Sequence, residues 1–179
     1  KRETKLHFIP SEGNQLETQL YKVISKAKRA IFIGTPYFIP SKRIYNELLQ
    51  ALDRGISITI LVPMKADHFL VKEASYPYLR RLIKQGANVY QYKKGFYHAK
   101  ILLVDDALCD VGTANFDKRS MFLNLELNCM IEDPEFIKEV QRILRQDIQD
   151  SEKVRLSSLN SFNPFRSLKE KAAQTVSYF

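Results

Sequence analysis

Short continuous apolar runs alternate with stretches of helical spacing along the first half of this chain. We expect the runs to form buried strands, because a strand that is covered on both faces carries few polar positions. These strands are expected at 30–34, 57–63 and 88–92. Helices are expected before and between them, the later two opened by a capping serine or aspartate and followed by a glycine. They are placed at 14–28, 41–53 and 67–84.

The pattern changes in the second half of the chain. KILLVD (100–105) and ALCDVG (107–112) predict two short strands around a tight turn at Asp105 and Asp106, so that a hairpin replaces the crossover helix. Apolar and polar residues then alternate, which predicts a strand with an apolar face made of Leu123, Leu125, Leu127, Cys129 and Ile131. Pro134 is expected to open a helix that runs to about residue 150. The sequence therefore predicts an α/β fold, a mixed β-sheet flanked by helices on both faces.

We place one domain over residues 1–155, because the chain is long enough for one hydrophobic core. Residues 156–179 are expected to hold a linker and a C-terminal amphipathic helix. From Pro164 onward, apolar side chains recur at helical spacing with basic residues between them. Two interpretations stay open: the helix packs on its own domain, or it lies on a membrane surface.

The chain is basic, with 28 Lys and Arg residues against 20 Asp and Glu residues and a net charge of +8. This favours anionic partners such as nucleic acid or an acidic lipid surface, and charge alone does not choose between them. No apolar run approaches the ~20 residues that span a bilayer, and no signal-peptide pattern is found, so this chain alone is not expected to cross a membrane. Cys109 and Cys129 lie in apolar alternating segments, which favours buried reduced thiols over a disulfide or a metal pair.

Candidate chemistry lies between His98 and Glu126. In a strand, His98 and Lys100 share a face because they are two residues apart. An imidazole beside an ammonium suits a phosphate, since imidazole attacks phosphorus or donates a proton while lysine neutralises the oxygens. Asp105 is an odd number of residues from both, so we expect it to face away and serve the structure. A metal site is disfavoured, because Lys100 stands where a second ligand would be needed.

Polar groups further along the same stretch extend the candidate site. Gly112 permits a tight turn, after which Thr113 and Asn115 can direct a hydroxyl and an amide toward one phosphate. Glu126 lies on the polar face of the last predicted strand, where it can accept the second ring N–H of His98 and fix its tautomer. The alternative is an exposed edge strand whose polar face is only solvated.

These residues resemble a known signature. The HKD motif of the phospholipase D superfamily is similar in every spacing to His98-x-Lys100, Asp105 and Gly112-Thr113-x-Asn115, with threonine where many members have serine. Over most of residues 29–131, the chain resembles the C-terminal half of bacterial cardiolipin synthases in the segments TPYFIPS, LVPMKADHFLV, GFYHAK and GTANFDKRSMFLNLELN. The resemblance implies a phospholipase D-like half domain.

The resemblance also implies a reaction, a double displacement at phosphorus that needs no metal or other cofactor. One histidine forms a phosphohistidine intermediate and a second protonates the leaving glycerol oxygen, so two motifs make one site. His98 would then be the acid/base, Lys100 and Asn115 would bind non-bridging oxygens, Glu126 would orient His98, and Asp105 would be structural. No second motif is found in this sequence.

Partners follow from the same resemblance. The substrate would be an anionic phospholipid, phosphatidylglycerol, at the cytoplasmic side of a bacterial cytoplasmic membrane. The second motif would come from an N-terminal HKD half of the same polypeptide, or from a second copy in a homodimer. Two other interpretations stay open: a homodimeric single-motif nuclease, for which nucleic acid is a less favoured partner, and a non-catalytic anion-binding module.

Aromatic residues beside the predicted strand ends are candidates for lining the substrate. Ligands gather at such ends in open α/β sheets, and the residues concerned are Tyr37, Phe38 and Phe96. Met64 and Asp67 can contribute similarly. The alternative for the aromatic residues is ordinary core packing.

Overall fold

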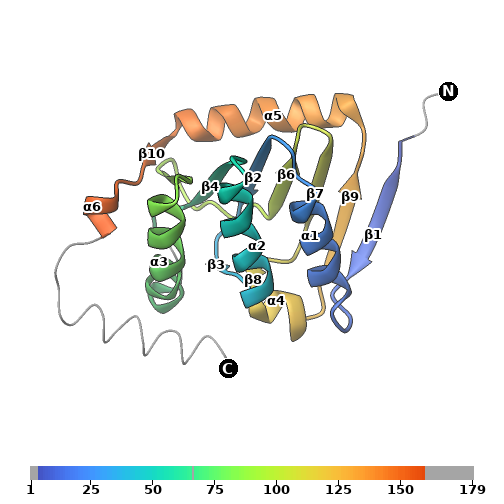
Figure 1. The fold of residues 1–179 in the computed structure, drawn as a ribbon, viewed down its shortest axis with the longest axis horizontal. Coiled ribbons are helices and arrows are strands. Elements are labelled where there is room, and N and C mark those ends of the chain that lie inside the picture. The colour runs from blue at the N-terminus through green and yellow to red at the C-terminus, as the bar shows by residue number, and fades with distance from the viewer. Residues whose placement is uncertain (1–3, 66, 160–179) are drawn as a thin grey trace.

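The computed structural model describes residues 4–65 and 67–159 and has a sheet with helices on both faces (Figure 1). The main sheet has eight strands. In order across it, they are β1 (Leu6–Pro10), β9 (Leu127–Ile131), β7 (Leu108–Gly112), β6 (Ile101–Val104), β2 (Ala30–Gly34), β4 (Ser57–Pro63), β5 (Asn88–Tyr92) and β10 (Ser151–Lys153). A second small sheet pairs β3 (Phe38–Ile39) with β8 (Phe116–Asp117) in parallel.

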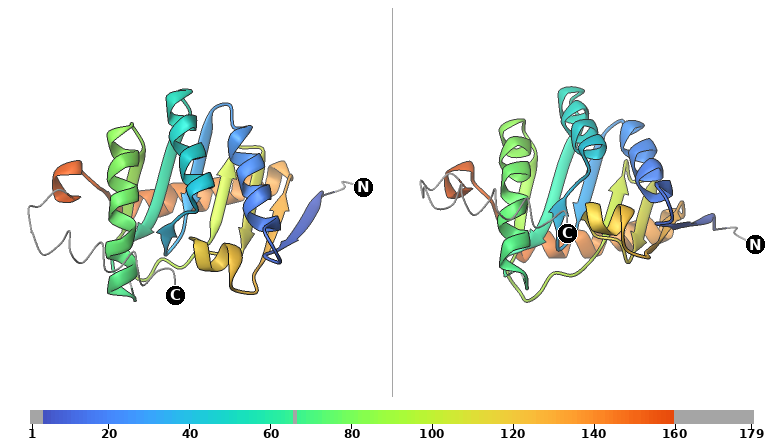
Figure 2. Two further views of the ribbon diagram at one scale, coloured as in Figure 1. Left: turned by 60° about the horizontal axis from the view of Figure 1, so that its bottom comes forward. Right: turned by 90° about the horizontal axis from the view of Figure 1, so that it is seen from below.

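The helices lie on both faces of the main sheet, as predicted. They are α1 (Gln15–Ser25), α2 (Lys42–Asp53), α3 (Phe69–Lys84), α4 (Lys118–Phe122), α5 (Pro134–Gln149) and α6 (Leu156–Leu159). α1, α2 and α3 cover one face, and α5 crosses the other (Figures 1 and 2). Strands β2, β4 and β5 run parallel, while the remaining neighbours pair antiparallel. The predicted mixed sheet is therefore confirmed.

Alternation along the central strand β2 divides the core into two layers. Ile31 and Ile33 are buried in the principal core under α1 and α2. Phe32, between them, points to the other face and packs with Leu103 and Cys109 under α5. Each fully buried isoleucine contributes about 1.5–3 kcal/mol to folding. This two-sided burial explains why the strand is apolar along its whole length.

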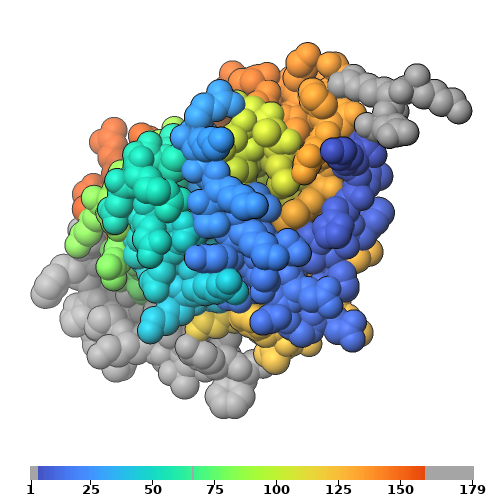
Figure 3. All heavy atoms as spheres, turned by 45° about the vertical axis from the view of Figure 1, so that its right-hand side comes forward, coloured from blue at the N-terminus to red at the C-terminus, as the bar shows by residue number. Residues whose placement is uncertain are grey.

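α1 and α2 lie side by side and form a continuous surface over the sheet (Figure 3). Ser41 caps α2 as predicted, since its Oγ accepts from the Ile44 N–H at 3.3 Å. The same hydroxyl donates to Glu17 of α1 at 2.5 Å. The Arg43 guanidinium lies 4.0 Å from the centre of the Tyr21 ring. These contacts fix the start of α2. They therefore also fix the end of the segment 35–41, which connects β2 to α2.

The predicted strands of the second half begin later than expected. The strand predicted from Lys100 begins at Ile101, and the one predicted over 123–131 begins at Leu127. The reason for the second difference is α4, whose C-terminal turn is closed by hydrogen bonds from the Leu123 and Asn124 N–H groups to a helix carbonyl. The leucines that follow are exposed, and Leu125 keeps 97% of its surface accessible. The alternating stretch is therefore a loop followed by a shorter strand.

The last elements of the described chain pack onto the domain. β10 pairs with β5, and α6 follows it. Leu159 is buried in the principal core, and its carbonyl oxygen accepts from Arg80 Nη1 at 3.2 Å. The helix predicted from Pro164 lies outside the described residues.

Two further expectations concern thiols and membrane spans. Cys109 is buried and Cys129 is partly buried, and both thiols are free. Within 4–65 and 67–159, every helix is too short or too polar to cross a bilayer.

Candidate active site

The chain segments that carry the predicted site residues meet at one edge of the main sheet. The parallel strands β2 and β4 both end there, at Gly34 and Pro63. β6 begins at the same edge because Ile101 pairs with Gly34, and β7 ends there at Gly112. β9 begins beside Gly112, at Leu127. The topology therefore brings together loops that are distant in the sequence.

His98 and Lys100 lie just before β6, outside the strand that was predicted to align them. The His98 ring is exposed and stacks on the Phe96 ring, with 5.1 Å between the ring centres. Lys100 is partly buried, and its Nζ donates to the His98 carbonyl oxygen at 2.8 Å. This hydrogen bond, and not a shared strand face, places the ammonium next to His98.

The Lys100 ammonium is surrounded by acidic groups. Burial lowers the pKa of Lys100 below its ordinary value, while the charges of Glu126, Asp67 and Asp117 act in the opposite direction. The charges of these acidic groups favour the protonated form of Lys100, which can donate hydrogen bonds to a phosphate oxygen.

Asn115 and Glu126 lie at the same edge. Asn115 is partly buried, and within the described part of the chain its Oδ1 has no hydrogen-bond partner. The Glu126 carboxylate accepts from the Asn124 amide at 3.2 Å. Among the described residues, no hydrogen bond joins Glu126 to His98, so the predicted orienting contact stays a prediction.

The turn after β7 is joined to β9 by hydrogen bonds. The Thr113 N–H donates to the Leu127 carbonyl at 3.1 Å, and the Thr113 Oγ1 accepts from the Leu127 N–H at 3.0 Å. The Thr113 hydroxyl proton is still available for a phosphate oxygen. Gly112 also allows close packing, because a Cβ there would lie 2.5 Å from the Leu127 carbonyl oxygen. Its φ is not positive, so the turn does not depend on a left-handed conformation at this residue.

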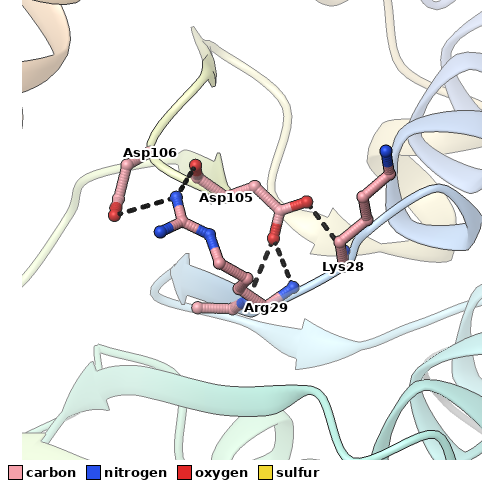
Figure 4. A network of polar contacts seen from close by, with 5 residues as sticks. Lys28, Arg29, Asp105 and Asp106 are labelled. Carbon is pink, nitrogen blue, oxygen red and sulfur yellow. Dashed lines mark hydrogen bonds and ion pairs between the residues drawn. The ribbon is translucent and has the colours of Figure 1, made fainter.

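Asp105 joins the β6–β7 hairpin to the start of β2 (Figure 4). Its carboxylate accepts from the backbone N–H groups of Lys28 at 2.7 Å, Arg29 at 2.7 Å and Ala30 at 3.0 Å. The Arg29 guanidinium donates to the Asp105 carbonyl at 2.7 Å and lies 3.6 Å from the Asp106 carboxylate. Asp105 therefore has a structural position, as predicted. The strand parity behind that prediction does not apply, because His98 and Lys100 lie before β6 and Asp105 lies in the turn after it.

The charge of Asp105 is stabilised by these donors. Burial alone would raise the pKa of its carboxyl, but the three backbone N–H groups and Arg29 outweigh burial and lower the pKa below its ordinary value. Asp105 and Asp106 have φ of 54° and 55°, the left-handed conformation that aspartate tolerates better than most residues. The predicted tight turn is confirmed.

A cavity of about 360 Å³ opens beside Asn115. Its lining includes both apolar and polar side chains. The apolar ones are Ile39, Leu70 and Val71, and the polar or charged ones are Tyr37, His68, Asn115, Asp117, Lys118, Arg119 and Asn124. Burial raises the pKa of Asp117, whose carboxylate also accepts from the Ser120 N–H at 2.8 Å and caps α4. The cavity can therefore accommodate both an apolar and a hydrogen-bonding part of one ligand.

Tyr37 lines this cavity, in agreement with its predicted place. Its hydroxyl donates to Asp67 at 2.7 Å, and both burial and the Asp67 charge raise the pKa of the phenol. His68 follows Asp67 and also lines the cavity, with its ring centre 6.1 Å from that of Tyr37.

The other two aromatic candidates differ from each other. Phe38 is fully buried and stacks on Phe116, with 5.8 Å between the ring centres, so its predicted place in the substrate lining is wrong and core packing explains it. Phe96 is 48% exposed and lies against His98, where it can contact a ligand. The Met64 carbonyl accepts from Lys72 Nζ at 2.7 Å, and its place in the substrate lining stays a prediction.

Comparison with known proteins agrees with this architecture. The family described as "Cardiolipin synthase, PLD-like domain" matches residues 20–148. The chain belongs to this family. The matched range contains every predicted site residue, from Tyr37 to Glu126. The resemblance to cardiolipin synthases of the phospholipase D superfamily is therefore confirmed.

Relatives in this family are cardiolipin synthases. The minor cardiolipin synthase ClsB of Bacillus subtilis (strain 168) is 41% identical over 173 residues, which cover 94% of this chain and 42% of ClsB. The major cardiolipin synthase ClsA of the same organism is 43% identical over 143 residues, which cover 80% of this chain and 30% of ClsA. The chain thus spans less than half the length of these relatives.

Solved structures share the fold at low sequence identity. Nuc from Salmonella typhimurium, a phospholipase D family member, matches with a TM-score of 0.74 and 19% identity over 86% of this chain and 99% of Nuc. The phosphatidylserine synthase of Haemophilus influenzae Rd KW20 matches with a TM-score of 0.77 and 20% identity over 97% of this chain and 47% of the synthase. The chain therefore has the fold of these proteins.

The structure adds residues to the site that the pattern of the sequence did not single out. Asp117, Asn124 and His68 line the cavity. The signal for Asp117 is its spacing from Ser120, which is typical of a helix cap. Within 4–65 and 67–159, no cluster of three or more His, Cys, Asp or Glu residues is arranged to hold a metal ion.

Proposed function

We propose that this chain is the C-terminal catalytic half of a cardiolipin synthase. The reaction is phosphatidyl transfer between two phosphatidylglycerol molecules with release of glycerol. The observation that carries the proposal is the gathering of His98, Lys100, Asn115 and Glu126 at one sheet edge, beside a cavity lined by apolar and polar side chains, in a chain of the cardiolipin synthase family.

In this proposal, the phosphodiester of the first lipid lies at Lys100. Lys100 Nζ and Asn115 Nδ2 donate to its non-bridging oxygens, where preorganised donors are worth several kcal/mol in a partly desolvated site. A histidine of the second motif attacks phosphorus and forms a P–N bond while the bond from phosphorus to the glycerol oxygen breaks. His98 gives its proton to that oxygen, and glycerol leaves.

The second lipid completes the transfer. Its glycerol hydroxyl gives its proton to His98 and attacks phosphorus, the P–N bond breaks, and cardiolipin forms. Glu126 stabilises the positive charge of the His98 ring when the two groups come into contact. Phe96 covers one face of that ring and excludes water from it. Excluding water favours transfer over hydrolysis.

The second motif comes from a partner half in this proposal, either elsewhere in the same polypeptide or in a second copy of the chain. Exposed apolar side chains next to Glu126 support a partner surface at this edge. Leu123, Leu125 and Leu127 are 65%, 97% and 48% exposed, respectively. Contiguous exposed apolar residues are typical of interaction sites.

The lipid substrate places the chain at a membrane surface, which we propose is the cytoplasmic side of a bacterial cytoplasmic membrane. The net charge of +8 supports attraction to anionic headgroups. The same charge supports the second candidate, a homodimeric phosphodiesterase or nuclease. Nuc and NucT from Helicobacter pylori match over 99% and 100% of their chains, so a unit of this size exists as a complete chain in this fold.

The test supplies the intact protein with vesicles of phosphatidylglycerol labelled in the headgroup glycerol. We expect labelled glycerol and cardiolipin to appear in equal amounts. Glycerol with phosphatidic acid and no cardiolipin would show hydrolysis and contradict transfer. Nicking of supercoiled plasmid without lipid turnover would favour the nuclease.

A further inference from the structure

A carboxylic acid lies in the core directly beneath the candidate site. Asp110 on β7 is 3% exposed. In the sheet it pairs with Leu102 on one side and Met130 on the other, and both belong to the principal core. A carboxyl in apolar surroundings costs several kcal/mol unless hydrogen bonds compensate it. We therefore expect Asp110 to have a function that an apolar side chain could not provide.

The contacts of Asp110 lead to the site. Its Oδ2 accepts from the Asn128 Nδ2 at 2.6 Å, and within the described chain its Oδ1 has no hydrogen-bond partner. Asn128 is also 3% exposed, and its Oδ1 accepts from the Ala114 N–H at 3.2 Å. A chain of two hydrogen bonds thus runs from Asp110 to the backbone beside Asn115.

The turn at Ala114 depends on which way the Asn128 amide faces. If that amide were rotated by half a turn, its NH₂ group would oppose the Ala114 N–H and two donors would meet. Gly112 packs so closely against Asn128 that a Cβ would lie 2.6 Å from the Asn128 Cα. The amide therefore has little room to find another partner.

We propose that Asp110 is a positioning residue for the transfer reaction: by accepting from Asn128 it sets the orientation of that amide, which holds the turn that carries Asn115. This inference rests on the proposed function for its catalytic consequence.

An aspartate at position 110 can set the orientation of the Asn128 amide better than an asparagine could. A carboxylate only accepts hydrogen bonds, so Asn128 must turn its NH₂ group toward it, whereas an amide at position 110 could donate or accept and would leave the orientation open. Burial raises the pKa of Asp110 to about 7, against the opposing effect of the Asn128 hydrogen bond. In both protonation states Oδ2 can accept from Asn128.

The experiment exchanges the two partners in the intact protein. Asn128→Asp places two carboxyl groups face to face, and we expect kcat to fall on the order of tenfold or more, with KM nearly unchanged. Adding Asp110→Asn reverses the pair: the new amide donates to the new carboxylate, whose second oxygen accepts from the Ala114 N–H. We expect this double variant to regain kcat to within a few-fold of the original protein.

Cys109→Ala is the matched control. Cys109 is the neighbour of Asp110 on β7 but points to the opposite face, under α5. We expect it to lower the melting temperature without changing kcat. A double variant as inactive as Asn128→Asp would overturn the proposal, and so would an Asn128→Asp variant with unchanged kcat.

Amide hydrogen exchange at Ala114 separates this proposal from the proposed function. We expect exchange to be faster in Asn128→Asp and slow again in the double variant, whether or not the protein makes cardiolipin. Absence of cardiolipin synthesis by the original protein would refute the proposed function alone. Unchanged protection of Ala114 in all variants would refute the positioning role.

Discussion

The hairpin turn offers a matched pair of substitutions, Asp105→Asn and Asp106→Asn. Both positions have left-handed φ, which asparagine tolerates, so backbone strain is nearly equal in the two variants. Asp105 accepts three backbone N–H groups, whereas Asp106 makes an exposed contact with Arg29 at 3.6 Å. The two variants therefore differ mainly in hydrogen bonding.

The expected loss follows from the geometry. In Asp105→Asn the amide keeps one oxygen for Arg29 and Ala30 and turns its NH₂ group against the Lys28 N–H, which now has no acceptor. One charge-assisted hydrogen bond is lost and two become neutral, so we expect the free energy of unfolding to fall by about 2–3 kcal/mol. For Asp106→Asn we expect a change of about 0–0.5 kcal/mol, as for other exposed ion pairs.

Urea denaturation monitored by circular dichroism measures both values, provided that the slope with denaturant stays constant. A pH series adds a second test. The pKa of Asp105 is lower in the folded than in the unfolded state, so its stabilisation is present above the unfolded pKa of about 3.9 and is lost as pH falls through the folded pKa. Equal losses in the two variants, or an acid transition that Asp105→Asn leaves unchanged, would refute the reasoning.

Three further predictions concern the site and the core. Lys100→Ala should keep the melting temperature but lower phosphatidyl transfer by about 10²-fold, because in the proposed reaction its ammonium binds the phosphodiester, and its hydrogen bond is to the carbonyl of the exposed His98; a collapsed fold would reverse this assignment. Phe38→Ala should lower the free energy of unfolding by about 3–5 kcal/mol, whereas the exposed Phe96→Ala should change it little and raise KM for lipid, as denaturation and kinetics together would show. Gly112→Ala should separate the turn from Leu127 and lower kcat in a protein that still folds; full activity would show that the close approach is unimportant.

Much of the fold follows from periodicity. The apolar runs of β2 and β4 and the glycines after α2 and α3 are strong local signals. The alternating leucines led to a wrong start for the last strand, because a spacing of two residues is also compatible with an exposed extended loop. The strand begins later because helix α4 precedes it. β3 and β8 have two residues each, too few for a periodic signal.

The part of the candidate site that comes from one sequence segment could be predicted from the spacing of its residues. The motif identifies His98, Lys100 and Asn115, and the polar side of the alternating stretch identifies Glu126. All four lie at one edge of the sheet. The burial of Phe38 could not be predicted, since an aromatic residue at a strand end suits a rim and a core equally. The contact of Asp110 with Asn128 depends on the register of β7 against β9, which no local pattern specifies.

The most direct test of the account is the rate of cardiolipin formation by His98→Asn in the intact protein, with His7→Asn as the control. His7 is an exposed histidine on β1 and has no part in the proposed reaction. We predict that His98→Asn lowers the rate by about 10²–10⁴-fold at an unchanged melting temperature, as expected for loss of a general acid, while His7→Asn retains it. Undiminished turnover by His98→Asn would contradict the central claim.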